Sequence, residues 1–140
     1  MDATTVSPPG SPNHCLALPP GVGLAKPQVV SPVFAVPPTA LALAWQRVVE
    51  RAPRTEIVEV SADGLSVEAI QRMPLIGFVD RISARAVALA GGGASLAVYS
   101  RSAVGYWDLG VNRRRVEAWL ADLGTVLQDG TGITRPSSRS

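Results

Sequence analysis

Three consecutive arginines, Arg113, Arg114 and Arg115, follow Asn112 and provide the residue type best suited to binding a carboxylate or a phosphate. Asn112 is a favourable N-cap, and the apolar residues behind it recur at helical spacing, so a helix is predicted to begin there. The arginines would then occupy its first turn, where the helix dipole disfavours each unpaired cation by about 0.3–1 kcal/mol. One interpretation is therefore an anion site, in which Arg101, Arg113 and Arg115 act with the free N–H groups of the helix.

The competing interpretation of these arginines is purely structural. Arg113 lies three residues before Val116, so its aliphatic stem is predicted to run along the apolar face of the helix, while Arg114 points towards solvent. An ion pair between Arg113 and either Asp108 or Glu117 would then hold the turn that leads into the helix.

Aromatic and hydroxyl side chains near the arginines complete the candidate binding site. Four aromatic side chains would flank the arginines as a pocket for a planar or anionic ligand: Tyr99, Tyr106, Trp107 and Trp119. In the alternative interpretation Trp119 belongs to the core and Tyr106 seals the turn. A large aromatic side chain beside Asp108 in a turn is expected to be partly exposed, and such exposure suggests a contact surface. The predicted ligand-binding residues are Arg101, Ser102, Tyr106, Trp107, Asp108, Asn112, Arg113 and Arg115.

Catalysis would require a base beside a nucleophile. Ser100 and Ser102 are the candidate nucleophiles, but the single histidine, His14, lies in a distant segment and no Gly-x-Ser-x-Gly motif is present. No catalytic residue is assigned, and one His with one Cys predicts neither a metal site nor a cofactor. The predicted function is a non-catalytic binding or assembly domain whose partner is a protein or a small anionic ligand. The alternative is a small hydrolase or transferase that uses Ser102, Asp108 and Arg113.

Length and composition limit the classes of protein to consider. The chain has 140 residues, 46% of them hydrophobic, which is enough for one domain to bury an ordinary core without disulfides or metal. Its formal net charge is only +2, so nucleic-acid binding is disfavoured. The uncharged stretch 27–46 is long enough to span a membrane, but prolines interrupt it. No transmembrane helix or export signal is predicted, and the chain, if complete, is expected in the cytoplasm.

Proline content and hydrophobic period predict the elements that position these residues. Residues 1–38 contain most of the twelve prolines and predict an extended arm that wraps the domain without forming a helix or a central strand. A helix is predicted from Thr39, its N-cap, to Ala52, and a second helix over 112–127, with a flexible tail at 128–140. Between the helices, alternating segments separated by turns predict four strands, at about 57–60, 65–70, 78–88 and 95–101.

These elements predict the fold class. Four strands joined by tight turns favour an antiparallel sheet with one face available for the helices. The expected fold is α+β, a two-layer sandwich of a four-stranded antiparallel sheet and two helices in the order arm-α-β-β-β-β-α. Its single α+β domain would span residues 39–127.

The segment from Ser100 to Glu117 also carries an extended motif. It leads from a strand with serines into Gly-Tyr-x-Asp-Leu-Gly-x-Asn-Arg-x-Arg-Val-Glu, and in this it resembles the signature of domain-of-unknown-function family 1499 (DUF1499). Two positions depart from the family pattern: Ala103 stands where an arginine is usual, and Trp107 where a small residue is usual. If that arginine belongs to a binding site, the site is altered in this chain. Shorter matches extend the resemblance over about residues 11–123, at Ser11-Pro12-Asn13, Pro53-Arg54-Thr55 and Phe78-Val79-Asp80.

The resemblance implies a fold but no activity, because none is established for the family. Many relatives are bacterial envelope proteins or plastid proteins with an added leader or membrane segment. The resemblance therefore implies peripheral envelope association as an alternative to a cytoplasmic location.

Overall fold

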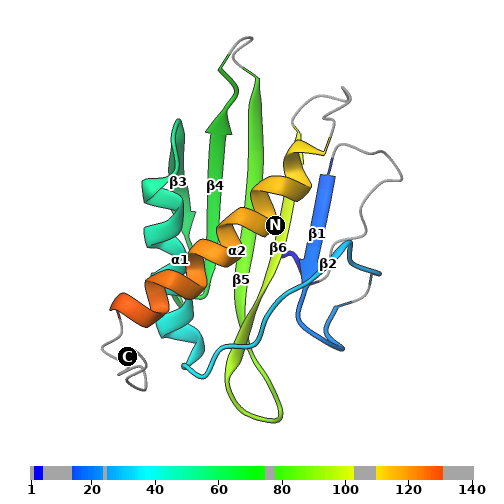
Figure 1. Cartoon of the computed structure of the whole chain (residues 1–140), viewed down its shortest axis with the longest axis vertical. Coiled ribbons are helices and arrows are strands. Elements are labelled where there is room, and N and C mark those ends of the chain that lie inside the picture. The colour runs from blue at the N-terminus through cyan, green and yellow to red at the C-terminus, as the bar shows by residue number, and fades with distance from the viewer. Residues whose placement is uncertain (1, 5–13, 24, 75–77, 103–109, 131–140) are drawn as a thin grey trace, which may run out of the picture.

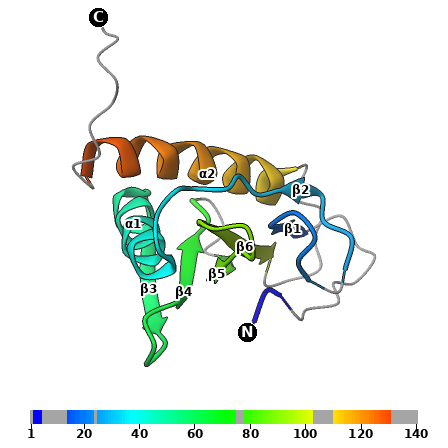
Figure 2. The same ribbon diagram turned by 90° about the horizontal axis from the view of Figure 1, so that it is seen from below.

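The protein forms one six-stranded sheet with two helices on one of its faces (Figure 1; Figure 2). The computed structural model describes residues 2–4, 14–23, 25–74, 78–102 and 110–130. The strand order is β2-β1-β6-β5-β4-β3; β1 and β2 are parallel, and every other neighbouring pair is antiparallel. The elements are β1 (His14–Leu18), β2 (Val29–Val30), α1 (Pro38–Arg51), β3 (Thr55–Val60), β4 (Ser66–Arg72), β5 (Val79–Ala88), β6 (Ala94–Ser102) and α2 (Val111–Gly130).

The predicted α+β class and the meander of four antiparallel strands, now β3 to β6, are confirmed. The prediction of a four-stranded, purely antiparallel sheet is wrong, because the arm contributes two further strands. Within the arm, β1 occupies a proline-free interval that ends at Pro19, so all its N–H groups can join the ladder. It pairs with β6 in the register His14↔Arg101, and β2 pairs with its other edge, so β1 is an interior strand (Figure 1).

Both helices begin differently from the sequence prediction. The N-cap of α1 is Pro37, which makes no side-chain cap, and Thr39 lies inside the helix. Proline is accepted there because the first N–H groups of a helix have no partner within it. In α2 the N–H of Arg114 donates to the carbonyl of Gly110 at 3.0 Å, so Asn112 lies within the first turn and its side chain is free to face the sheet. The helix continues to Gly130, so residues 128–130 belong to it and not to the tail.

The main core lies between the helices and one face of the sheet. Every second residue of the central strands points into it, including Ile82 of β5 and Val98 of β6. Trp45 of α1 and Trp119 of α2 meet edge to face with their ring centroids 5.7 Å apart, which joins the two helices across the core. This packing fixes which face of α2 is turned towards the sheet.

A smaller apolar cluster lies on the opposite face of β1 and β6. Leu16 and Leu18 of β1 pack there with Ala97 and Tyr99 of β6, and Ala3 from the N-terminal segment is also buried in this cluster. The arm therefore contributes to the apolar clusters on both faces of the sheet. At β1 and β6 it covers the face that the helices leave open.

Candidate functional site

Arg115 is the buried centre of a polar network between α2 and the sheet. Its Nη2 atom lies 2.8 Å from Oδ2 of Asp80 on β5, and the two side chains are 5% and 0% exposed. Its Nε–H donates to Gln71 of β4 at 2.6 Å, and Nη1 donates to Ser100 of β6 and to the side-chain oxygen of Asn112 at 2.9 and 2.8 Å. The guanidinium thus connects three strands to the helix that carries it.

The backbone positions explain why these side chains meet. Gln71 pairs with Asp80, and Asp80 pairs with Ser102, so one row across three strands points at α2. Asn112 and Arg115 are three residues apart on the helix and therefore share the face turned to that row. The Asn112 amide binds two serines of β6: its oxygen accepts from Ser100 at 2.7 Å, and its nitrogen donates to Ser102 at 3.1 Å.

This arrangement engages the donors of Arg115 with groups of the chain itself. Nη2 also reaches the sulfur of Met73 at 3.9 Å, so each guanidinium nitrogen has a partner. An external anion would have to displace the Asp80 carboxylate from a buried position. The chemistry that the network performs is therefore internal neutralisation of charge.

Arg113 lies on the exposed side of α2, contrary to the prediction that its stem follows the apolar face. Its Nε atom is 3.3 Å from the Glu117 carboxylate, and the two side chains are 56% and 50% exposed. The predicted pairing with Glu117 is therefore present, but at the surface. The apolar stripe is centred on Val116, Trp119 and Leu123, which places Arg115 within it and Arg113 beyond its edge.

Arg101 lies on the other face of the sheet. Successive strand residues alternate between faces, so its side chain points away from those of Ser100 and Ser102. Its guanidinium carbon is 5.3 Å from the ring centroid of Tyr99. Burial raises the pKa of the Tyr99 phenol, and the charge of Arg101 opposes that rise. The Nη1 atom of Arg101 is buried and has no hydrogen-bond partner among the residues that the structure describes.

The predicted binding residues therefore separate into groups. Ser102, Asn112 and Arg115 come together in the buried network, Arg113 is on the surface of α2, and Arg101 is across the sheet. Tyr106, Trp107 and Asp108 lie outside the described residues.

Sequence reasoning missed Gln71 and Asp80, although a signal for both was available. Alternate residues of a strand point to the same face. Asp80 therefore lies on the same face of its strand as Ile82 and Ala84, and Gln71 on the same face as Ala69, which is the buried face. A buried carboxylate requires a buried cation, and this requirement could have directed attention to the helix arginines.

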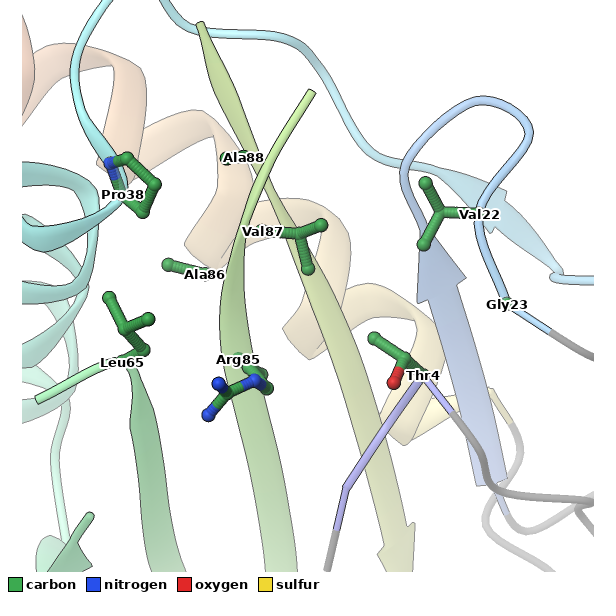
Figure 3. A pocket seen from close by; sticks show the side chains of 9 residues that line it. All are labelled: Thr4, Val22, Gly23, Pro38, Leu65, Arg85, Ala86, Val87 and Ala88. Atoms are coloured by element: carbon green, nitrogen blue, oxygen red, sulfur yellow. The ribbon is translucent and has the colours of Figure 1, made fainter. Parts of the chain in front are cut away.

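Other features of the described chain do not form a competing centre. A groove of about 520 Å³ lies beside the C-terminal end of β5, lined by apolar side chains such as Leu65 and Val87 and by Arg85 (Figure 3). The Arg85 guanidinium is bound to Asp63 at 3.0 Å and to Ser66 at 2.7 Å. In the parts of the chain that are described, no cluster of three or more His, Cys, Asp or Glu side chains is arranged to hold a metal ion. Helices in the same parts are all too short or too polar to cross a membrane.

Comparison with known proteins identifies the family but not an activity. No curated protein gives a significant match to this sequence. A solved structure, the crystal structure of protein CV1439 from Chromobacterium violaceum, is similar with a TM-score of 0.40 and 12% sequence identity, over 81% of this chain and 94% of that one. The family model described as "Protein of unknown function (DUF1499)" matches residues 8–123. The resemblance found in the sequence is thus confirmed, and the chain belongs to the DUF1499 family.

Proposed function

We propose that this protein is a non-catalytic binding domain that recognises an anionic group, carried by a small ligand or by a protein partner, through Arg101 at the end of β6. The observation that supports this is that the three candidate arginines differ in whether a carboxylate of the chain already pairs with them. Arg115 is neutralised by Asp80, and Arg113 is paired with Glu117. Arg101 has no carboxylate partner within the described ranges, and one of its nitrogens has no hydrogen bond.

The arrangement of the serines supports binding in preference to catalysis. A nucleophilic serine needs a base within hydrogen-bond reach. Ser100 and Ser102 are both bound by Asn112, and Ser100 is also bound by Arg115; neither Asn112 nor Arg115 can accept a proton at neutral pH. His14 pairs with Arg101 across the strands, so it lies on the opposite face from both hydroxyl groups.

A titration of the full chain with acetate and with inorganic phosphate tests the proposal. Backbone amide NMR signals near Arg101 are expected to shift saturably, and Arg101→Met is expected to weaken the binding by about tenfold or more, the scale of one lost charge-assisted hydrogen bond. Arg113→Met is the matched control, because it removes an exposed arginine that already has a partner.

Two results would overturn the proposal. The first is equal weakening by Arg101→Met and Arg113→Met, or no saturable shift with either anion. The second is hydrolysis of an ester substrate by the purified protein that Ser102→Ala abolishes, which would instead support the hydrolase alternative.

A further inference from the structure

His14 and Arg101 occupy directly facing positions on β1 and β6. Side chains at such positions lie on the same face of the sheet with Cβ atoms about 4.5–5.5 Å apart. Each of the two carries one buried nitrogen without a hydrogen-bond partner among the described residues, Nδ1 of His14 and Nη1 of Arg101. Unsatisfied buried polar atoms are uncommon in folded proteins, so two at facing positions require an explanation.

The contacts of Gln28 determine which nitrogen of His14 carries the proton. The side-chain oxygen of Gln28 accepts a hydrogen bond from the N–H of Leu16 at 2.7 Å, which fixes the orientation of the amide. Its nitrogen therefore faces Nε2 of His14, at 3.1 Å. An amide nitrogen only donates, so Nε2 accepts and the neutral ring holds its proton at Nδ1. The unpartnered atom of His14 is thus a hydrogen-bond donor.

Both unpartnered atoms are consequently donors, and one of them belongs to a permanent cation. The group that satisfies two neighbouring donors beside a positive charge is an oxyanion, which offers two oxygens and a negative charge. A metal cation is unsuited, because neither donor has a lone pair to offer. Both nitrogens are buried, but each residue as a whole is only partly buried, so the pair lies close to the protein surface.

Tyr99 holds both side chains in place. Its ring lies against the Arg101 guanidinium, and its centroid is 6.0 Å from that of the His14 ring. Tyr99 is itself buried in the small cluster on this face of the sheet. The donors are therefore carried by two adjacent strands and supported by a packed aromatic ring, which is the preorganisation that a binding site requires.

We infer that His14 and Arg101 form a two-donor site for a single oxyanion, a carboxylate or a phosphate, with Nδ1–H and Nη1–H as its hydrogen-bond donors. This inference rests on the proposed function, which needs Arg101 alone, and adds the arm residue His14 to the site.

The test follows the imidazole nitrogens of His14 by NMR in the full chain during titration with acetate and, separately, with inorganic phosphate. The free protein is expected to show the tautomer protonated at Nδ1, and the Nδ1–H proton should move downfield as the anion binds. Saturation with acetate alone would identify a carboxylate site, and saturation with phosphate alone a phosphate site. A tautomer protonated at Nε2, or an Nδ1 signal that neither anion moves, would overturn the inference.

Two variants of His14 distinguish the contribution of the Nδ1–H donor to anion binding from that of the imidazole ring. His14→Leu removes the donor and is expected to weaken anion binding by about tenfold. His14→Asn keeps an N–H close to the position of Nδ1 and is expected to retain most of the affinity. If Arg101→Met weakens binding and His14→Leu does not, the two-donor site is refuted while the proposed function stands. If neither variant weakens binding, both are refuted.

Discussion

Arg115 of α2 and Asp80 of β5 form a buried ion pair, with Nη2 and Oδ2 separated by 2.8 Å and both side chains almost fully excluded from solvent. The pair joins the C-terminal helix to the middle of the sheet. Gln71, Ser100 and Asn112 surround it and satisfy the remaining donors of the guanidinium. Removal of either charge would take away the buried ion-pair partner of the other, so the attachment of α2 depends on both side chains.

Replacing Arg115 by methionine is expected to destabilise the protein by about 3–5 kcal/mol, because the Asp80 carboxylate would stay buried after losing its ion pair with Arg115. Urea unfolding followed by tryptophan fluorescence measures this change, since Trp45 and Trp119 both lie in the core. The double variant Asp80→Asn with Arg115→Met should lose less stability than the sum of the losses of the two single variants. Additive losses would show that the two side chains do not interact.

Arg113→Ala, on the same helix, removes an exposed ion pair and is expected to have a much smaller effect on stability than Arg115→Met. Its partner Glu117 is half exposed, and exposed ion pairs four residues apart on a helix contribute about 0.3–0.5 kcal/mol. The free energy of unfolding is expected to fall by no more than that, and the fall should shrink further in high salt. A loss as large as that of Arg115→Met would contradict the surface position of Arg113.

Asp63 should make the stability of the protein depend on pH in the acid range. Hydrogen bonds from the Ser61 hydroxyl, the Leu65 N–H and the Arg85 guanidinium lower the pKa of its carboxyl group from 3.8 to about 2. Because the pKa is lower in the folded state, the stabilisation is complete above pH 3.8 and is lost as the pH falls through about 2. Asp63→Asn should therefore unfold at a lower temperature than the parent at pH 7, and thermal scans at decreasing pH should show the gap close near pH 2. A gap that does not change with pH would refute this role.

The turn between β5 and β6 offers a matched pair of glycine substitutions. Gly93 has φ +78°, and a Cβ there would lie 2.6 Å from the carbonyl oxygen of Phe34, which accepts a hydrogen bond from Ala94. Gly93→Ala is expected to cost at least about 1–2 kcal/mol from the backbone conformation alone. At Gly91 a Cβ would meet nothing within 4 Å, so Gly91→Ala should change stability by less than about 0.5 kcal/mol. Equal effects in urea unfolding would contradict this difference.

The sequence predicted the elements whose patterns are local. The meander from β3 to β6 was predicted because alternation and turn glycines are properties of neighbouring residues. β1 was missed because its pairing with β6 joins distant parts of the chain, and the surrounding prolines favoured an irregular arm. Its proline-free interval was the signal that could have revealed it.

The candidate site was only partly predictable for a similar reason. Arg115 and Asn112 were selected from their type and position, but the phase of the apolar stripe decides which arginine is buried. Spacing from Val116 and Leu120 predicted that Arg113 follows the apolar face, whereas the full buried stripe, with Trp119 and Leu123, includes Arg115. The pairing of His14 with Arg101 could not be inferred, because it depends on the same long-range contact between β1 and β6.

That contact also has a consequence for the order of folding. During synthesis, His14–Leu18 are made early. Their pairing partner on β6 is made only after α1 and the first three strands of the meander. Adjacent hairpins close short loops, whereas the β1–β6 pair must close a loop containing most of the domain, which has a larger entropic cost. β1 must therefore wait for its β6 partner while the meander forms, and its docking against β6 is expected to be the last step that completes the sheet.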